Sequence, residues 1–426
     1  MSNTVCVIGL GYVGLPLAIA FDNAGVETIG FDIDEEKVST LSQGADPTDE
    51  VRDAAIANST VTFSSNASVI EEATHVLVTV PTPIDELKNP NLEHVTSAGE
   101  LIGEHITRGT TVVLESTVYP GATREILAPA IEKTSGLTVG EGFHIAYSPE
   151  RMVPGDEDHS LANVVKIVSG ESEDVLVDVT SLYEEVVDAG IHQAPEIEVA
   201  EAAKCIENIQ RDLNIALVNE LAVACESMDL DTHDVLDAAA TKWNFHEYHP
   251  GLVGGHCIPV DPFYIIYESE RNGFQPRLIN QAREVNEYMP EFVAEQTIHA
   301  LNDHGNVLRD STVLVLGLAY KPGVNDLRTS AIGGTIEKLH SFDVEVVGWE
   351  PYADDEMVRD EFGIEPVSTA VADADAVILA TPHEEFLDVD FPARYGGTGT
   401  TIPLVDVVGA LNKAAFDGSD VEYVRI

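Results

Sequence analysis

A glycine-rich segment near the N-terminus has the spacing of a dinucleotide-binding turn. Gly9, Gly11 and Gly14 form GLGYVG directly after a short β-branched run and open a stretch with helical periodicity. The first glycine suits a tight turn, the second lets the backbone approach a pyrophosphate, and the third lets helix and strand pack closely. Asp32 ends the next expected strand, where an acid accepts hydrogen bonds from ribose hydroxyls and repels a 2′-phosphate. The motif favours NAD over NADP; a tight turn that binds nothing is the alternative.

A cysteine lies in a second glycine-rich segment, HPGLVGGHCIPVDPFY, residues 249–264. Its glycines and prolines indicate a fixed loop, and a cysteine held there near a cation can act as a thiolate nucleophile. A small buried hydrophobe is the ordinary alternative for one cysteine. His256 and Asp261 invite a zinc interpretation, but no second cysteine or histidine pair accompanies them at metal-ligand spacing. We therefore expect no metal and take Cys257 as the candidate nucleophile.

Other polar residues could assist such a nucleophile. Lys204 and Asn208 stand four residues apart on an expected helix, hence on one face, where an amine and an amide together can hold an oxyanion. Two further segments, STVYPG at 116–121 and YSPER at 147–151, each end an expected strand. The carboxyl ends of parallel strands are where a Rossmann-like domain binds its ligand. A thiol, an oxyanion site, a carboxylate and NAD together suggest an oxidation that passes through a thioester.

The elements that must position these residues repeat at the two ends of the chain. Each end has three apolar, strand-like runs separated by helical stretches: 4–9, 27–34 and 73–83, then 312–322, 344–352 and 374–384. This alternation implies right-handed βαβ units with parallel sheets. We predict an α/β protein with two Rossmann-like doubly wound domains, at 1–195 and 301–426, joined by a helical domain at 196–300 that carries the cysteine loop.

One long helix is expected at the start of the central domain. Residues 196–230 contain no proline or glycine and keep apolar residues at three-to-four spacing. Such a helix has more apolar surface than one packed face needs, so we expect it to join the domains and to form part of a homodimer interface. Two helices with an unmarked break are the alternative.

The second Rossmann unit lacks the glycine fingerprint. Its first strand ends at Gly317, and Lys321 and Arg328 follow in the next loop. Cations at the carboxyl end of a strand suit an anion, and a guanidinium can grip phosphate through two parallel hydrogen bonds. This pattern favours a nucleotide other than the cofactor; a solvated loop with ordinary charges is the alternative.

The charge balance excludes several kinds of partner. The 426 residues hold 74 Asp and Glu against 22 Lys and Arg, a formal charge of −52, yet 44% are hydrophobic, as in globular proteins. Such a surface does not suit nucleic acid or an anionic membrane, and is typical of proteins from a salt-rich, halophilic cytoplasm. No membrane-spanning run or leader is recognised, so a soluble cytoplasmic protein is expected. We expect activity to need high salt, and the few cations to gather where anionic ligands bind.

Seven motifs carry a resemblance to a known family. They are GLGYVG, VPTP, STVYPG, YSPER, the Lys204–Asn208 helix, GGHCIPVDP and YKPGVNDLRTS, and they follow one another from Gly9 to Ser330. In this order the chain resembles the nucleotide-sugar 6-dehydrogenases, which include UDP-glucose and UDP-N-acetylhexosamine dehydrogenases. The resemblance implies oxidation of the primary alcohol at carbon 6 of a UDP-sugar to a carboxylate, with two NAD used in turn.

The resemblance also implies roles for individual residues. Cys257 would attack the intermediate aldehyde, giving a thiohemiacetal and then a thioester. Lys204 and Asn208 would stabilise the oxyanion, and Asp261, assisted by Glu150 or Lys204, would activate the hydrolytic water.

The implied binding residues form two sets. NAD would be held by Gly9, Gly11, Tyr12, Val13, Gly14, Asp32, Lys37, Thr82 and Thr117. The substrate would be held by Glu150, Arg151, Lys204, Asn208, Gly254, Gly255, Lys321 and Arg328, with the C-terminal domain binding the UDP.

The sequence of the cysteine loop favours some UDP-sugars over others as the substrate. UDP-glucose enzymes of the family usually read CxPKD, whereas Val260 replaces that lysine here. This favours UDP-N-acetylmannosamine, ahead of UDP-N-acetylglucosamine and UDP-glucose, although no residue decides the configuration at carbon 2. A non-catalytic nucleotide-sugar sensor would not need Cys257. A two-electron 3-hydroxyacid dehydrogenase would lack the second Rossmann unit and the cysteine loop.

Overall fold

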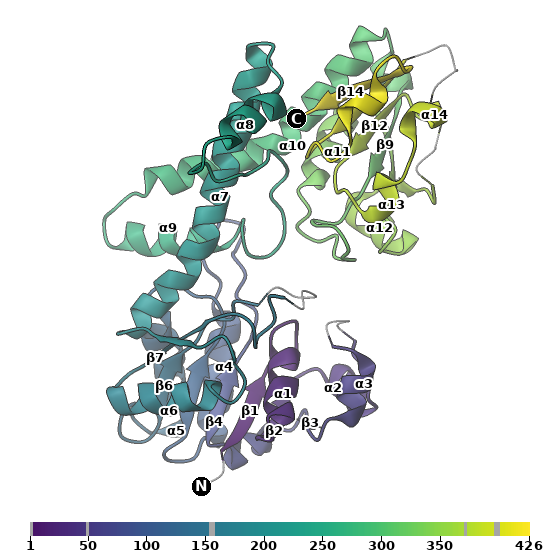
Figure 1. Cartoon of the computed structure of the whole chain (residues 1–426). Coiled ribbons are helices and arrows are strands. Elements are labelled where there is room, and N and C mark those ends of the chain that lie inside the picture. Colours follow the sequence, from purple (N-terminus) through teal and green to yellow (C-terminus); the bar gives the residue numbers. More distant parts are fainter. Residues whose placement is uncertain (1–2, 48–50, 153–157, 370–372, 396–400) are drawn as a thin grey trace. The chain divides into compact units, whose positions relative to one another are not determined.

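The computed structural model describes residues 3–47, 51–152, 158–369, 373–395 and 401–426 (Figure 1). The chain divides into two compact units, each with its own sheet. Unit 1 comprises Met1–Glu207 and Val260–Gln275, and unit 2 comprises Asn208–Pro259 and Pro276–Ile426. The division into three domains at 195/196 and 300/301 stays a prediction.

The sheet of unit 1 has eight strands in the order β3-β2-β1-β4-β5-β6-β7-β8 (Figure 1, purple to teal). Its strands are β1 (Thr4–Ile8), β2 (Glu27–Phe31), β3 (Thr62–Ser64), β4 (His75–Val78), β5 (Thr111–Leu114), β6 (His144–Tyr147), β7 (Lys166–Gly170) and β8 (Ile191–Gln193). All neighbours are parallel except β6 and β7, where Tyr147 pairs with Ser169. Because β7 is reversed, its first residue, Lys166, lies toward the edge where β1, β4, β5 and β6 end.

Helices flank this sheet because its strands are buried on both faces. The helices of unit 1 are α1 (Gly14–Asn23), α2 (Glu35–Ser42), α3 (Asp53–Asn58), α4 (Glu93–His105), α5 (Ala128–Ser135), α6 (Glu173–Tyr183) and α9 (Asp261–Arg271), with a 3-10 turn η1 (Ala67–Glu72) and a π-helical turn η2 (Thr123–Leu127). Asp34 caps the N-terminus of α2 and Ser172 that of α6, each through its side-chain oxygen.

The expected long helix is confirmed as α7 (Ile197–Ser227), one continuous helix of 31 residues. It contributes residues to both units, because the division falls after Glu207. The helix does not break because its sequence offers no proline or glycine.

Unit 2 has a six-stranded sheet in the order β11-β10-β9-β12-β13-β14, with all neighbours parallel (Figure 1, green to yellow). Its strands are β9 (Thr312–Leu316), β10 (Glu345–Trp349), β11 (Glu365–Pro366), β12 (Ala376–Leu379), β13 (Ile402–Asp406) and β14 (Val421–Arg425). Its helices are α8 (Thr232–Ala240), α10 (Arg277–Asp303), α11 (Ile332–His340), α12 (Asp355–Phe362), α13 (Glu384–Leu387) and α14 (Phe391–Tyr395), with 3-10 turns η3 (Leu308–Asp310) and η4 (Lys413–Phe416).

The predicted repeat of the Rossmann unit is confirmed down to its first turn. In unit 1 the Gly9 N–H donates to Phe31 O, and in unit 2 the Gly317 N–H donates to Trp349 O. Both glycines have positive φ, +92° and +81°. The two units differ after this turn, because α1 begins at Gly14 whereas α11 begins only at Ile332, beyond a long loop.

Candidate active site

The glycine turn of unit 1 has the shape that a pyrophosphate needs. A Cβ on Gly14 would lie 1.8 Å from Gly9 O and 2.4 Å from Thr79 Oγ1, so α1 packs directly on the turn. A Cβ on Gly11 would meet no atom within 4 Å, which leaves open space beside the backbone there. Close helix packing at one glycine and free space at another are the two requirements of the fingerprint.

Asp32 stands beside this turn as an ionised acid. Its Oδ2 accepts from the Leu10 N–H at 2.8 Å and from Lys37 Nζ at 2.8 Å, and its Oδ1 accepts from the Asp34 N–H at 3.0 Å. Burial would raise the pKa of Asp32, but the hydrogen bonds from Lys37 and the two backbone amides lower it overall. A buried anion here fits ribose hydroxyls and disfavours a 2′-phosphate.

The remaining cofactor candidates lie along the same edge of the sheet. Val13 is the N-cap residue of α1, and the neighbouring Tyr12 is exposed. Thr82 and Thr117 follow β4 and β5 and are half-buried. The Tyr264 hydroxyl donates to Thr82 O, which ties this loop to α9.

Glu150 belongs to a buried charge cluster that the sequence did not reveal. It follows β6, and Lys166 Nζ lies 3.0 Å from its Oε2 and 2.6 Å from Glu115 Oε2. The sequence signal for this cluster is a charged residue within or directly after an apolar run, as in VVLE and VVKIV. Arg151 instead pairs with Glu207, with 2.8 Å between Nη2 and Oε1.

The face of α7 that carries Lys204 is anchored to the turn after STVYPG. Buried Glu201 accepts from the Gly121 N–H at 2.5 Å, the Thr123 N–H at 2.9 Å and the Thr123 hydroxyl at 2.6 Å. Burial raises the pKa of Glu201 to about 7 against these hydrogen bonds. Lys204 is half-buried one turn further along the helix. Glu201 therefore anchors α7 to this turn, a contact that sequence reasoning missed.

Asp261 and Lys204 both lie near the Cys205 thiol in unit 1. Asp261 is the first residue of α9 and is 3% exposed. Burial raises the pKa of Cys205 most, Asp261 raises it further and Lys204 lowers it, so both charges are close to this thiol. The buried Tyr147 hydroxyl has no hydrogen-bond partner among the described residues, which makes it a place for a water.

Cys257 and Asn208 belong to unit 2. Cys257 is an exposed cysteine, and Asn208 is buried. Next to Cys257, His256 Nε2 lies 3.0 Å from Asp326 Oδ2, so this histidine pairs with the loop after β9. No group of His, Cys, Asp or Glu side chains that could hold a metal ion occurs in the described part of the chain.

The glycines before Cys257 are required by close packing. A Cβ on Gly254 would lie 2.8 Å from Thr329 O, and one on Gly255 would lie 2.9 Å from the Tyr320 ring. Gly255 also has a φ of +89°, and its N–H donates to Thr329 O at 3.2 Å. The cysteine loop is thus fixed against the loop that carries Lys321.

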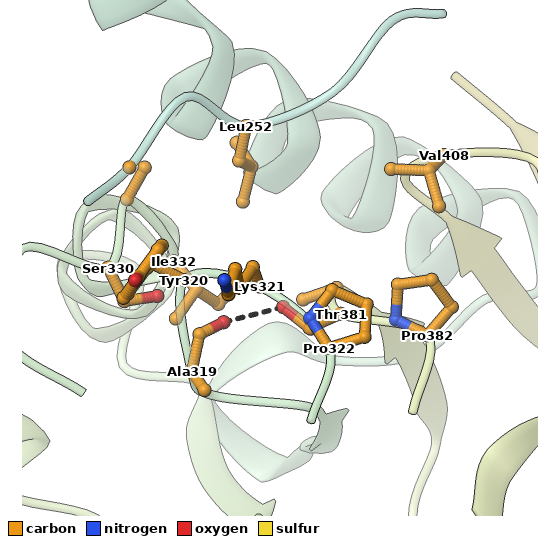
Figure 2. Close-up of a pocket in the computed structure, with 13 residues that line it drawn as sticks. Leu252, Ala319, Tyr320, Lys321, Pro322, Ser330, Ile332, Thr381, Pro382 and Val408 are labelled. Carbon is orange, nitrogen blue, oxygen red and sulfur yellow. Dashed lines mark hydrogen bonds between the residues drawn. The ribbon is translucent and has the colours of Figure 1, made fainter. Parts of the chain in front are cut away.

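The two cations of that loop differ in their surroundings. Lys321 lines a hollow of about 120 Å³ together with Gly254, Ser330 and Thr381, and the Thr381 hydroxyl donates to Ala319 O at 2.6 Å (Figure 2). Arg328 is 61% exposed at its side chain, and its Nε and Nη2 each lie 3.0 Å from the Asp326 carboxylate. The forked guanidinium that was expected to face phosphate is therefore engaged by Asp326 in this structure.

Unit 2 has an acid, Glu350, at the position that Asp32 occupies in unit 1, and this acid contacts a histidine. Glu350 Oε2 accepts from the Leu318 and Ala319 N–H groups at 2.8 and 2.9 Å and lies 3.1 Å from His383 Nε2. His383 Nδ1 accepts from the Gly323 N–H at 3.1 Å, so the ring proton is assigned to Nε2 and donated to Glu350. Both side chains are fully buried. This acid therefore holds the turn after β9 through two backbone amides and the Lys321 loop through His383.

Comparison with known proteins identifies the family. The models of the UDP-glucose/GDP-mannose dehydrogenase family match residues 3–187 (NAD binding domain), 198–288 (central domain) and 314–413 (UDP binding domain). The chain belongs to this family. The dehydrogenase thus uses NAD, and its first Rossmann unit is the NAD-binding one.

Individual relatives cover nearly the whole dehydrogenase. Protein CapL of Staphylococcus aureus is 42% identical over 91% of this chain and 92% of its own length. The UDP-N-acetyl-D-glucosamine 6-dehydrogenase of Pseudomonas aeruginosa is 44% identical over 90% of this chain and 91% of its own. The structure of UDP-D-ManNAc dehydrogenase from Pyrococcus horikoshii superposes with a TM-score of 0.89 at 28% identity, covering 99% of both chains. In the part of the dehydrogenase that the structure describes, no helix has the length and apolar character of a membrane span.

The NAD preference of the dehydrogenase is expected to depend on the charge of Asp32. Asp32→Asn keeps a side-chain oxygen but removes the anion, so NAD should bind about tenfold more weakly, the equivalent of about 1.4 kcal/mol, while NADP should lose less. Titration calorimetry with both cofactors measures this. The matched control is Glu36→Gln, which changes an exposed acid in α2 and should alter neither affinity. An unchanged NAD-to-NADP ratio in Asp32→Asn would contradict this role.

Proposed function

We propose that the enzyme oxidises the 6-hydroxyl of a UDP-N-acetylhexosamine to a 6-carboxylate, with two NAD consumed in turn. The observation that carries this proposal is the exposed Cys257, on a loop that Gly254 and Gly255 fix against the Lys321 loop. A thiol in this place is not needed for a two-electron oxidation or for mere binding. Val260, in place of the lysine typical of UDP-glucose enzymes, supports an N-acetylated sugar.

Within this class, UDP-N-acetylglucosamine becomes the favoured substrate. The relative named for this sugar is 44% identical, whereas the Pyrococcus horikoshii relative named UDP-N-acetyl-D-mannosamine dehydrogenase is 32% identical. This reverses the order expected from the sequence, which placed UDP-N-acetylmannosamine first. UDP-glucose is the runner-up from outside the class.

Residues of this chain supply the covalent chemistry. When bound, NAD accepts the hydride in each of the two oxidation steps. Between them, the Cys257 thiolate adds to the carbon-6 aldehyde, and Lys204 and Asn208 stabilise the resulting oxyanion. The second oxidation leaves a thioester on Sγ, which a water positioned by Asp261 and Glu150 hydrolyses. The covalent bond retains the half-oxidised sugar, so a reactive aldehyde is not released.

Each ligand would have its own set of residues. The Gly9–Gly14 turn, Asp32, Lys37, Thr82 and Thr117 would hold NAD. The hollow beside Lys321 would take part of the UDP (Figure 2), with Arg328 reaching it after release from Asp326. The cytoplasmic location and the salt dependence expected from the sequence stay predictions.

We further propose that two copies pair along α7. This helix exposes four large apolar side chains that a monomer leaves in water: Val199, Ile206, Leu217 and Leu221. A second copy of the same helix offers a matching apolar surface under two-fold symmetry.

Binding of UDP is expected to depend on His383, although this residue is buried. His383→Leu leaves Glu350 without its ring donor and the Gly323 N–H without its acceptor, so the Lys321 loop should lose its fixed shape. UDP should bind about tenfold more weakly, since a hydrogen bond to a charged group contributes about 1.5–3 kcal/mol. Calorimetry with UDP measures this. NAD binding, which belongs to unit 1, is the internal control, and unchanged UDP affinity in the folded variant would contradict the role.

Ranking kcat/KM for three UDP-sugars tests the proposed substrate. The assay uses purified enzyme, NAD and high salt, with UDP-N-acetylglucosamine, UDP-N-acetylmannosamine and UDP-glucose. The highest value is expected for UDP-N-acetylglucosamine. A preference for UDP-glucose would overturn the N-acetylhexosamine class, and binding of a UDP-sugar without any oxidation would indicate a sensor.

A further inference from the structure

Unit 1 contains a buried lysine that joins two carboxylates from different elements. Lys166 opens β7, Glu115 directly follows β5, and Glu150 lies in the segment after β6. Their side chains are 2%, 0% and 10% exposed. Of the lysines in the described residues, Lys166 is the buried one. A buried ammonium is stable only when it is paired, so the three groups act as one cluster.

Both oxygens of Glu150 are held. Its Oε1 accepts from the Arg151 and Met152 N–H groups, each at 2.7 Å, and its Oε2 accepts from Lys166 at 3.0 Å. Burial would raise the pKa of Glu150, but Lys166 and these two amides lower it overall. Glu150 is therefore a fixed anion and a poor proton acceptor, which suits a group that orients a water or a hydroxyl.

The other end of the cluster carries the exchangeable proton. Glu115 Oε1 accepts from the Tyr183 hydroxyl, the Tyr183 ring lies 5.2 Å from Lys166 Nζ, and Ser148 faces the same hydroxyl. Burial raises the pKa of Glu115 to about 7, although Lys166 opposes the shift. Below this pH the pair of Lys166 and Glu150 is neutral, and above it one ammonium is shared between two anions.

We propose that Lys166 is a positioning residue that holds Glu150 in its reactive orientation, and that Glu115 sets how strongly it does so. The inference rests on the proposed function, because it acts through Glu150. When Glu115 loses its proton, it draws Lys166 toward itself, and the hold on Glu150 weakens. Lys166 therefore links protonation of a group outside the reaction to the rate of the reaction.

Three variants test this link. Lys166→Met removes the ammonium, and kcat should fall about tenfold to a hundredfold, as expected for a misplaced catalytic group, while KM for NAD stays within about threefold. Glu115→Gln keeps Lys166 on Glu150 at every pH. The ratio of wild-type to Glu115→Gln kcat should therefore fall as pH rises through about 7. Taking the ratio cancels the ionisations that the two enzymes share.

The double variant Lys166→Met/Glu115→Gln keeps the test decisive if two unpaired carboxylates prevent Lys166→Met from folding. Its kcat should be as low as that of Lys166→Met. The ratio of its kcat to that of Glu115→Gln should show no step near pH 7, because neither variant has Glu115. The control is Lys133→Met, which removes an exposed lysine 2.6 Å from Glu100 and should change neither kcat nor the profile. A folded double variant with wild-type kcat would overturn the proposal. A ratio of wild-type to Glu115→Gln kcat that does not change with pH would overturn it as well.

An infrared titration separates this inference from the proposed function. A wild-type enzyme that oxidises no UDP-sugar would refute the function. The band of protonated Glu115 should still titrate near pH 7 in the difference between wild-type and Glu115→Gln spectra, which cancels the contribution of Glu201 in the same range. If that band is absent from the wild type near neutral pH, the inference fails whatever the enzyme oxidises.

Discussion

Cys257→Ser is expected to abolish the four-electron oxidation. A serine hydroxyl is not ionised near neutral pH, so it cannot trap the carbon-6 aldehyde as the thiolate does. Carboxylate formation should fall at least about a thousandfold, since loss of a nucleophile costs up to about a millionfold in other enzymes. The first oxidation should still occur, because it does not use the thiol.

NADH yield and binding together measure this effect. The variant should release at most one NADH per sugar in a single turnover, with an aldehyde detectable by trapping. UDP and NAD should bind as in the wild type, because Cys257 is exposed and supports no core packing. A full NADH yield from the variant would refute the thioester route.

Gly14→Ala is expected to lose stability, whereas Gly11→Ala is expected to lose affinity for NAD. The new Cβ on residue 14 would lie 1.8 Å from Gly9 O, a backbone atom that cannot move aside, so α1 must shift. Overpacking costs about 1–3 kcal/mol of unfolding free energy, and a clash with backbone should lie at the upper end of this range. The new Cβ on residue 11 meets nothing within 4 Å, so its cost should stay within about 0.5 kcal/mol. That Cβ instead occupies the space left for the pyrophosphate.

Chemical denaturation and NAD titration distinguish the two glycines. Gly14→Ala should unfold at markedly lower denaturant, whereas Gly11→Ala should unfold like the wild type and bind NAD at least about tenfold more weakly. Each variant is the matched control of the other. Equal stability in both variants would contradict the packing of α1 on the turn, and unchanged NAD affinity in Gly11→Ala would contradict the pyrophosphate position.

Most of the fold could be predicted because its signals are local. Apolar runs ending in glycine predict β1 and β9, and the absence of breakers predicts α7. The reversal of β7 could not be predicted, because VVKIVSG has the composition of any buried strand and direction depends on the connections. The reversal matters, since it brings Lys166 to the edge where Glu150 lies.

The candidate site could be predicted only where its residues are neighbours in sequence or match a motif. The turn from Gly9 to Gly14 and the cysteine loop are of this kind. Glu115 and Lys166 are 51 positions apart, and Glu350 and His383 are 33 apart, so only the fold shows that each pair meets. The pairing of Arg328 with Asp326 is local but competes with the expected phosphate contact.

Counting NADH per sugar tests the central claim most directly. The purified enzyme, given limiting UDP-N-acetylglucosamine and excess NAD in high salt, should form two NADH for each sugar. Mass spectrometry should find the 6-carboxylate as the product, with no free aldehyde. One NADH per sugar with the aldehyde accumulating, or no NADH from any UDP-sugar, would contradict the account.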